Sequence, residues 1–309
     1  KNINKAISYL SLASDQNHSF AQCILGKIYY EGKLIDRNIV KAMHYLSLSS
    51  DQNNVYAQFM LGFIYYQGKY IKPNTLKAIE YFKRAANKNH EDAQFLLSDI
   101  YFNGNSVTKD IKQSVFYLVL ASKNGNRMAN FIHGFYLQEG KYLKKNMEEA
   151  IHYYKEASSF NIEYAKNNLG VIYMVGCNFI KQSPGNAIAY FKEAIRQEQD
   201  YLAMYNLALI YTFNTNIKSE INETYDLLIK SSQKFNHSLV LLCLILVKQV
   251  GSDIEMIKQK VEMLTKKKDE LLNQICDKIY DLKLYDKKIF DSKYNSYKER
   301  YFIYNASYN

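Results

Sequence analysis

The sequence predicts an all-α fold, a right-handed superhelical α/α solenoid of about six helix–turn–helix repeats followed by a C-terminal helix. A period of 36 residues separates five alanines, and a sixth follows after 38: Ala21, Ala57, Ala93, Ala129, Ala165 and Ala203. Glycines recur five and eleven residues beyond these alanines, and a tyrosine recurs eight residues beyond five of them. Periods of this length are typical of solenoids of stacked helix pairs.

Each repeat reads as two amphipathic helices, A and B. In the second copy, helix A spans about Val55–Gln67 and helix B about Thr75–Asn87, because apolar residues recur there at spacings of three and four. Gly68 stands where helix A must end, at a position that tolerates a left-handed backbone. The alanine and glycine columns let two helices approach closely, so we expect them to be critical for packing.

The two ends of the array depart from the repeat. The first helix, about Asn4–Asp15, is a B helix without a preceding A helix, so we expect the sequence to be a piece of a longer protein. We expect the array to cover residues 1–251, with a partial first repeat and a degenerate last one. In residues 252–286, apolar residues at spacings of three and four predict one long helix, about Asp253–Tyr285. This helix either caps the array or forms a dimeric coiled coil. Residues 287–309 read as a Tyr/Lys-rich tail or a short last helix.

Two segments carry a family signature. The sequence AQFMLGFIYYQG at residues 57–68 is followed by KAIEYFKRAA at residues 77–86. This combination resembles the Sel-1-like repeat, a longer relative of the tetratricopeptide repeat, and the resemblance covers about residues 1–237. It implies a helical scaffold that binds other proteins.

Composition and charge bound the protein further. The chain has 309 residues, is 48% hydrophobic and carries a formal net charge of +10, of which the repeats hold +8. Much of that charge lies in the A–B loops, which form either a solvated edge or a surface that steers acidic partners. The longest apolar run, Leu239–Val247, is too short to span a bilayer. The four cysteines show no paired spacing, which favours a reducing, cytoplasmic location.

No catalytic constellation is present in the sequence, and we expect neither enzymatic activity nor a cofactor nor a metal. The six histidines do not combine with Cys, Asp or Glu at ligand spacing on one helix face. His133 occupies the usual leucine column and reads as a histidine in the core. The segments around Gly62 and Gly68-Lys69 have the wrong spacing for a phosphate-binding loop.

The candidate binding surface follows from helix geometry. Offsets of 2, 6 and 9 residues from the repeat alanine share the side of helix A opposite the predicted core. We expect this side to line a concave groove for an apolar or helical peptide. Its alternative is partial burial against the neighbouring repeat. The predicted partner-binding residues are Phe59, Phe63, Tyr66, Phe95, Asp99, Phe102, Phe131 and Phe135.

Three functions compete on this evidence. The leading one is a non-catalytic protein–protein interaction scaffold or adaptor. The second is the regulatory repeat region of a larger enzyme, for example a protein kinase. The third is an RNA-binding helical repeat, which the offset of 6 disfavours because Lys27 is followed there by Phe63 and Asp99 rather than by further basic residues. An adaptor of the endoplasmic reticulum would need a signal that this sequence does not display.

Overall fold

The structure is a computed structural model that describes residues 3–196, 200–213, 221–250, 256–257, 259–260, 268–282, 284 and 287–296. These residues form helices and turns, with an isolated bridge between Cys177 and Ile180 and no strand among them. The all-α prediction is therefore confirmed. The chain divides into two compact units, one within residues 1–146 and the other within residues 147–305.

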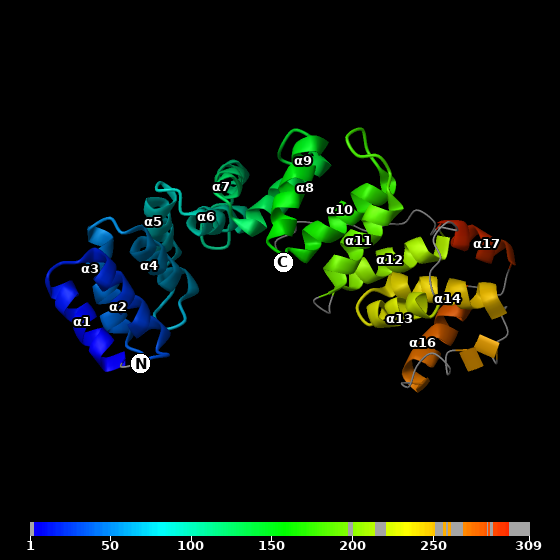
Figure 1. Cartoon of the computed structure of the whole chain (residues 1–309), viewed down its shortest axis with the longest axis horizontal. Helices are drawn as coiled ribbons and strands as arrows, with labels where there is room; N and C mark the ends of the chain where they lie inside the picture. Colours follow the sequence, from blue (N-terminus) through cyan, green and yellow to red (C-terminus); the bar gives the residue numbers. More distant parts are fainter. Residues whose placement is uncertain are drawn as a thin grey trace. The chain divides into compact units, whose positions relative to one another are not determined.

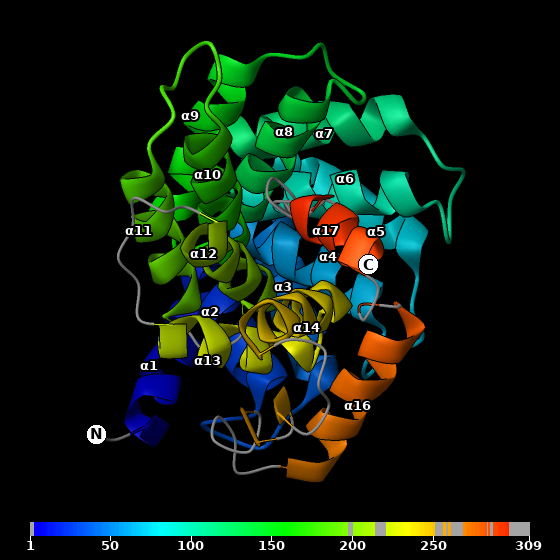
Figure 2. The same cartoon turned by 90° about the vertical axis from the view of Figure 1, so that its right-hand side faces the viewer.

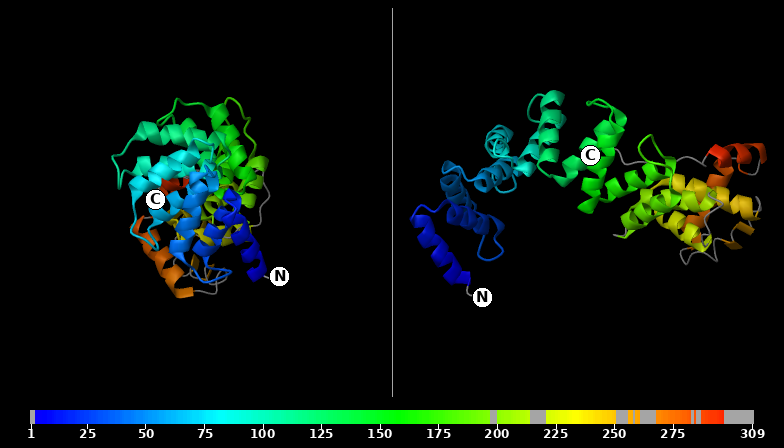
Figure 3. Two further views of the ribbon diagram at one scale, coloured as in Figure 1. Left: turned by 90° about the vertical axis from the view of Figure 1, so that its left-hand side faces the viewer. Right: turned by 45° about the horizontal axis from the view of Figure 1, so that its top comes forward.

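Unit 1 consists of helices that pack against one another in chain order (Figure 1). The colours of the right-hand view in Figure 3 follow the same order from blue to green. Its helices are α1 (Ile3–Asp15), α2 (Ser19–Glu31), α3 (Ile39–Asp51), α4 (Val55–Gln67), α5 (Thr75–Ala86), α6 (Glu91–Asn103), α7 (Ile111–Lys123) and α8 (Arg127–Glu139). The A helix predicted at Val55–Gln67 is confirmed to the residue, and its B helix ends one residue earlier than predicted.

Unit 2 continues the A–B alternation and ends in helices of another kind. Its described helices are α9 (Met147–Ser159), α10 (Glu163–Val175), α11 (Pro184–Ile195), α12 (Tyr201–Phe213), α13 (Ile221–Ser232), α14 (Asn236–Val250), α16 (Lys268–Asp281) and α17 (Lys287–Ser296). The long helix predicted at Asp253–Tyr285 lies partly outside the described residues, so its cap and coiled-coil alternatives stay open.

A close contact holds the two helices of a repeat together. In the second copy, Ala57 and Leu61 are fully buried. A Cβ atom added to Gly62 would lie 2.6 Å from Cδ1 of Phe82 in α5, so only glycine leaves room for that ring. Beside this contact, the ring of Tyr65 stacks on that of Tyr81, with centroids 5.9 Å apart. The same stacking recurs in Tyr29–Tyr45, Tyr101–Tyr117 and Tyr173–Tyr190.

The turns repeat as faithfully as the helices. Gly68 ends α4 in the left-handed conformation, with φ of 60°, and its N–H donates to the carbonyl of Ile64. After the seven-residue A–B loop, the side chain of Asn74 caps α5 while its N–H donates to the Tyr65 carbonyl, 2.9 Å away. The B-to-A turn uses left-handed asparagines in place of glycine in four copies: Asn17, Asn53, Asn89 and Asn161.

A buried glutamine ties each of the helices α2, α4 and α6 to the B helix before it. Gln58 of α4 donates from Nε2 to the Ser50 carbonyl, 3.4 Å away. Its Oε1 has no hydrogen-bond partner among the described residues. The equivalent oxygens of Gln22 and Gln94 accept from Gln52 and Asn124, respectively. In the second copy that donor position is Lys88, which donates instead to the Asn53 carbonyl, 2.8 Å away.

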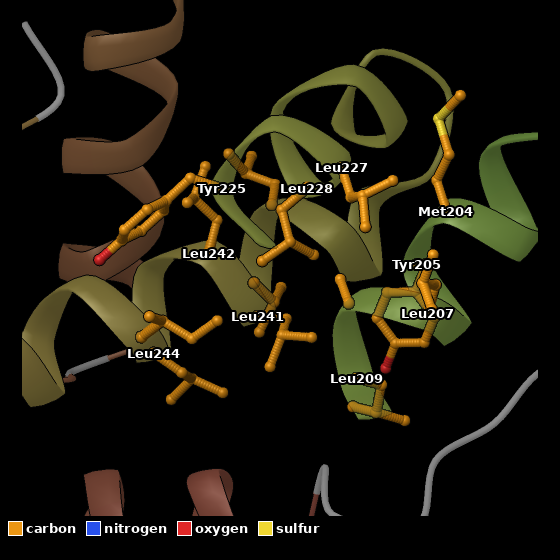
Figure 4. Close-up of a cluster of buried hydrophobic side chains, with 14 of the residues drawn as sticks. Met204, Tyr205, Leu207, Leu209, Tyr225, Leu227, Leu228, Leu241, Leu242 and Leu244 are labelled. Carbon is orange, nitrogen blue, oxygen red and sulfur yellow. The ribbon is translucent and has the colours of Figure 1, made fainter. Parts of the chain in front are cut away.

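Unit 2 has the larger continuous apolar core. Side chains of α12, α13 and α14 interdigitate in it, and Figure 4 shows Tyr205, Leu228 and Leu241 among them. Figures 1 and 2 both place α13 beside α14, and α16 also packs on α14. The thiol of Cys243 in α14 reaches the Ile275 carbonyl of α16, 3.8 Å away. Helix α14 therefore lies in the interior rather than at a binding surface.

Candidate functional site

The predicted binding face of α4 and α6 is half-buried rather than open. Phe59 packs against the ring of Phe82 in α5, with centroids 6.0 Å apart, and also stacks on Phe63. Tyr66 meets Phe82 edge-on at 6.2 Å. The rings of this face, together with those on α6, are all intermediate in exposure: Phe59, Phe63, Tyr66, Phe95 and Phe102. The side of helix A opposite the alanine column thus also contributes to packing between helices.

On α8 the two predicted binding residues are buried, as the alternative of packing against neighbouring helices allowed. Phe131 is only 3% exposed and Phe135 only 7% exposed. Helix periodicity groups these rings with Phe59 and Phe63, but it does not specify how closely other side chains approach that stripe. Whether any of the eight predicted residues contacts a partner stays a prediction.

A groove opens instead near the beginnings of the A helices of unit 1. It has a volume of about 740 Å³ and is lined by α2, α4 and the turn that leads into α6. Its apolar lining comes from Phe20, Cys23, Ile24, Val55, Tyr56, Phe59 and Met60. Its charged lining comes from Lys27 of α2 and from Lys88, Glu91 and Asp92 at the turn into α6. Phe59 is the predicted binding residue that lines this groove.

Two exposed aromatic residues border the groove and were missed by the sequence analysis. Phe20 is 58% exposed and Tyr56 is 64% exposed, so both rings present more than half of their surface to solvent. Each lies one residue before a repeat alanine, three residues before the offset of 2. Extending the predicted stripe by one helical turn toward the N-terminus would have found both.

His90 also lines the groove. Its ring stacks on Phe59, with centroids 4.4 Å apart, and meets Tyr56 edge-on at 5.7 Å. Nδ1 accepts the N–H of Ala93 and so caps α6. Burial lowers the pKa of His90, although the charge of neighbouring Glu91 opposes that shift. The stacked imidazole ring of His90 is therefore neutral near neutral pH.

Asp99 is the one carboxylate among the predicted binding residues. Its Oδ2 accepts from the hydroxyl of Tyr66 at 3.2 Å, and its Oδ1 accepts from Asn103 at 2.9 Å. Burial raises the pKa of Asp99, while these two hydrogen bonds lower it. The carboxylate is thus engaged inside unit 1 and links α4 to α6.

The sequence matches the model of the Sel1 repeat along most of its length. The matched residues are 1–18, 19–54, 55–90, 91–126, 127–159, 163–198 and 202–233. This coverage exceeds half of the chain. The protein belongs to the Sel1 repeat family. The matched units coincide with the A–B helix pairs described above, so the recognised resemblance is confirmed.

Two solved structures share this Sel1 fold. One is a protective antigen of uropathogenic Escherichia coli strains with an SLR fold, with a TM-score of 0.62 and 20% identity over 97% of this chain and 73% of that chain. The other is a Sel1 repeat protein from Oxalobacter formigenes, with a TM-score of 0.58 and 23% identity over 75% of this chain and 94% of that chain. Among curated proteins, none matches this sequence.

The described Sel1 units hold no cluster that points to metal chemistry. Within the described ranges, no three side chains of His, Cys, Asp or Glu gather as a metal site would require. In the same ranges, no helix combines the length and apolarity needed to cross a membrane. The arrangement offers an apolar groove with aromatic rims, a lining that suits the binding of an apolar ligand.

Proposed function

We propose that this Sel1 repeat chain is a non-catalytic protein-interaction scaffold whose groove between α2 and α4 binds an amphipathic peptide segment of another protein. Sel1 repeat proteins are generally protein-interaction scaffolds, and the proposal places that role in a specific part of this one. The observation that carries it is the pair of exposed rings, Phe20 and Tyr56, at the rim of an apolar groove.

The chemistry of the groove supports a peptide over a small polar ligand. Its lining includes apolar side chains such as Ile24 and Met60, which favour burial of apolar side chains from the partner. Exposed aromatic residues often dominate binding energy, because they bury large areas at low entropic cost. Lys27 and Glu91 on the walls then favour a partner with polar residues on its outer side.

A cytoplasmic location is part of the proposal. The four cysteines are all free thiols, and two of them, Cys23 and Cys243, are buried. Burial raises the pKa of the Cys243 thiol to about 12, so this thiol is unreactive near neutral pH. Such thiols suit a reducing compartment.

Peptide selection tests the proposal directly. Peptides of about 12 residues, a length that spans several turns of helix, would be selected from a random display library on the purified chain. Binding would then be measured by fluorescence anisotropy for wild type, Phe20→Ala/Tyr56→Ala, and the control Phe116→Ala. Phe116 is a matched control because it is 55% exposed on α7 and does not line the groove.

We expect the groove variant to weaken the selected peptides by at least about tenfold, since each exposed ring contributes about 1–2 kcal/mol. The control should bind as wild type does. Equal binding by all three proteins would refute the groove as the site. Failure to enrich any peptide would refute the proposed function itself.

A further inference from the structure

The net charge of the chain is concentrated in unit 1. Residues 1–146 hold 19 basic and 10 acidic residues, a net charge of +9, whereas residues 147–309 hold 21 and 20, a net charge of +1. Charge asymmetry of this size between two parts of one chain indicates an electrostatic partner for the charged part. The groove does not account for it, because its lining holds two basic and two acidic residues, with His90 neutral.

Most of this charge lies on one edge of unit 1. The A–B loops 32–38, 68–74, 104–110 and 140–146, which we call the loop edge, carry 8 basic and 2 acidic residues, a net charge of +6. Each of these loops follows the C-terminus of an A helix, whereas the groove borders the beginnings of α2, α4 and α6. An A helix of 13 residues is about 20 Å long, so the two surfaces are distinct.

The first two loops touch each other, and the end of α6 touches the fourth loop. Arg37 of the first loop lies over the ring of Tyr70 in the second, 4.5 Å from its centroid. The same Arg37 donates to the carbonyls of Tyr30 and Glu31, which fixes its position. Further along, Phe102 at the end of α6 meets Tyr142 of the fourth loop at 6.3 Å.

Two lysines of the loop edge, Lys109 and Lys141, lie over aromatic rings rather than against carboxylates. Lys109 lies 4.8 Å from the centroid of Phe102, and Lys141 lies 5.1 Å from that of Tyr142. Lys33 of the first loop pairs with Glu31 at 3.7 Å, whereas among the described residues no carboxylate lies within 4.0 Å of the Lys69, Lys109 or Lys141 ammonium. Lys69, Lys109 and Lys141 therefore present positive charge that the unit itself does not neutralise.

We propose that the loop edge of unit 1 binds an acidic, extended polypeptide segment. Extended chain advances about 3.3–3.6 Å per residue, so a segment of sufficient length places Asp or Glu side chains at successive loops. Single-stranded nucleic acid fits less well, because it needs free aromatic faces for base stacking. Here the faces of Tyr70, Phe102 and Tyr142 already carry cations. This inference does not depend on the groove proposed above.

The test uses the whole chain and a fluorescein-labelled glutamate homopolymer of about 20 residues, long enough to cross the four loops. The edge variant is Lys69→Glu/Lys109→Glu/Lys144→Glu, which leaves the structural Arg37 in place. The matched control is Lys5→Glu/Lys123→Glu/Arg127→Glu, which has the same net charge and changes three exposed residues away from the loops. An oligouridylate of about 20 nucleotides serves as the nucleic-acid probe.

We expect the edge variant to lose about tenfold or more in affinity for the glutamate polymer, and the control to lose about threefold or less. Added salt should weaken wild-type binding. Equal losses in the two variants would overturn the proposal, because net charge alone would then explain binding. If wild type binds the oligouridylate more tightly than the glutamate polymer, and the edge variant loses that binding, the partner of the loop edge would be nucleic acid rather than an acidic peptide. The groove variant Phe20→Ala/Tyr56→Ala should bind the polymer as wild type does, which separates this result from the fate of the groove.

Discussion

Replacing His133 by leucine should make unit 1 more stable in acid. Leucine or its equivalent fills this column in other repeats, as Leu61 and Leu97 do, and His133 is itself only 4% exposed. Nδ1 of His133 lies 3.0 Å from Oγ of Ser122, whose hydroxyl donates to Oδ1 of Asn130 at 2.7 Å. Because the hydroxyl proton is used there, Nδ1–H of His133 donates to Ser122, and further protonation must occur at the buried Nε2.

The magnitude follows from proton linkage. Burial, with a smaller contribution from the charge of Lys123, lowers the pKa of His133 from 6.5 to about 4. The unfolded chain therefore takes up a proton as the pH falls below about 6.5, whereas the folded chain does so only near pH 4. His133 therefore does not lower the free energy of unfolding above about pH 6.5. On acidification it lowers that free energy by about 2 kcal/mol at pH 5 and by about 3 kcal/mol below pH 4.

Urea unfolding followed by far-UV circular dichroism measures the effect at about pH 7.5 and pH 5. Wild type should lose about 2 kcal/mol more than His133→Leu between these two conditions. His44→Leu, at an exposed position on α3, is the control and should lose as much as wild type. Parallel losses in wild type and His133→Leu would refute the reasoning, because His133 would then titrate normally in the folded state.

Three further changes test the packing. Gly62→Ala should destabilise the chain by about 1–3 kcal/mol in the same unfolding assay, because the new Cβ lies 2.6 Å from the Phe82 ring; a stability gain would show that the ring moves freely. Lys88→Gln should raise the free energy of unfolding by about 1 kcal/mol, because the new side chain can donate to the unpaired Oε1 of Gln58, as Gln52 donates to Gln22 in the first copy. An unchanged urea midpoint would contradict this. Phe135→Ala should cost about 3–5 kcal/mol as a buried ring, and a neutral effect would return Phe135 to the candidate surface residues.

Much of the fold was predictable because the same helix-forming and helix-ending residues recur in each repeat. The alanine column, the glycine at Gly68 and the polar residue at Asn74 together specify where α4 ends and α5 begins. These are local rules of helix periodicity and capping, so they hold in each copy without knowledge of its neighbours. The position of His133 in a buried column was readable for the same reason.

The candidate site was predicted only in part. Helix geometry correctly grouped Phe59, Phe63 and Tyr66 on one stripe, and Phe59 does line the groove. It did not reveal that the groove lies one turn nearer the N-terminus, where Phe20 and Tyr56 are exposed. A stripe has a fixed direction around the helix, but its exposure along the helix depends on what packs beside it.

The sequence by itself determined the helices, their caps and the columns of small residues, because those depend on interactions between residues close in the chain. Only the tertiary structure decided that Phe135 is buried while Phe20 is open, and that Lys109 and Lys141 lie over aromatic rings at one edge. Both outcomes depend on distances between residues of different helices or loops. Periodicity orients side chains around one helix, whereas burial and electrostatic pairing depend on how closely the next elements approach.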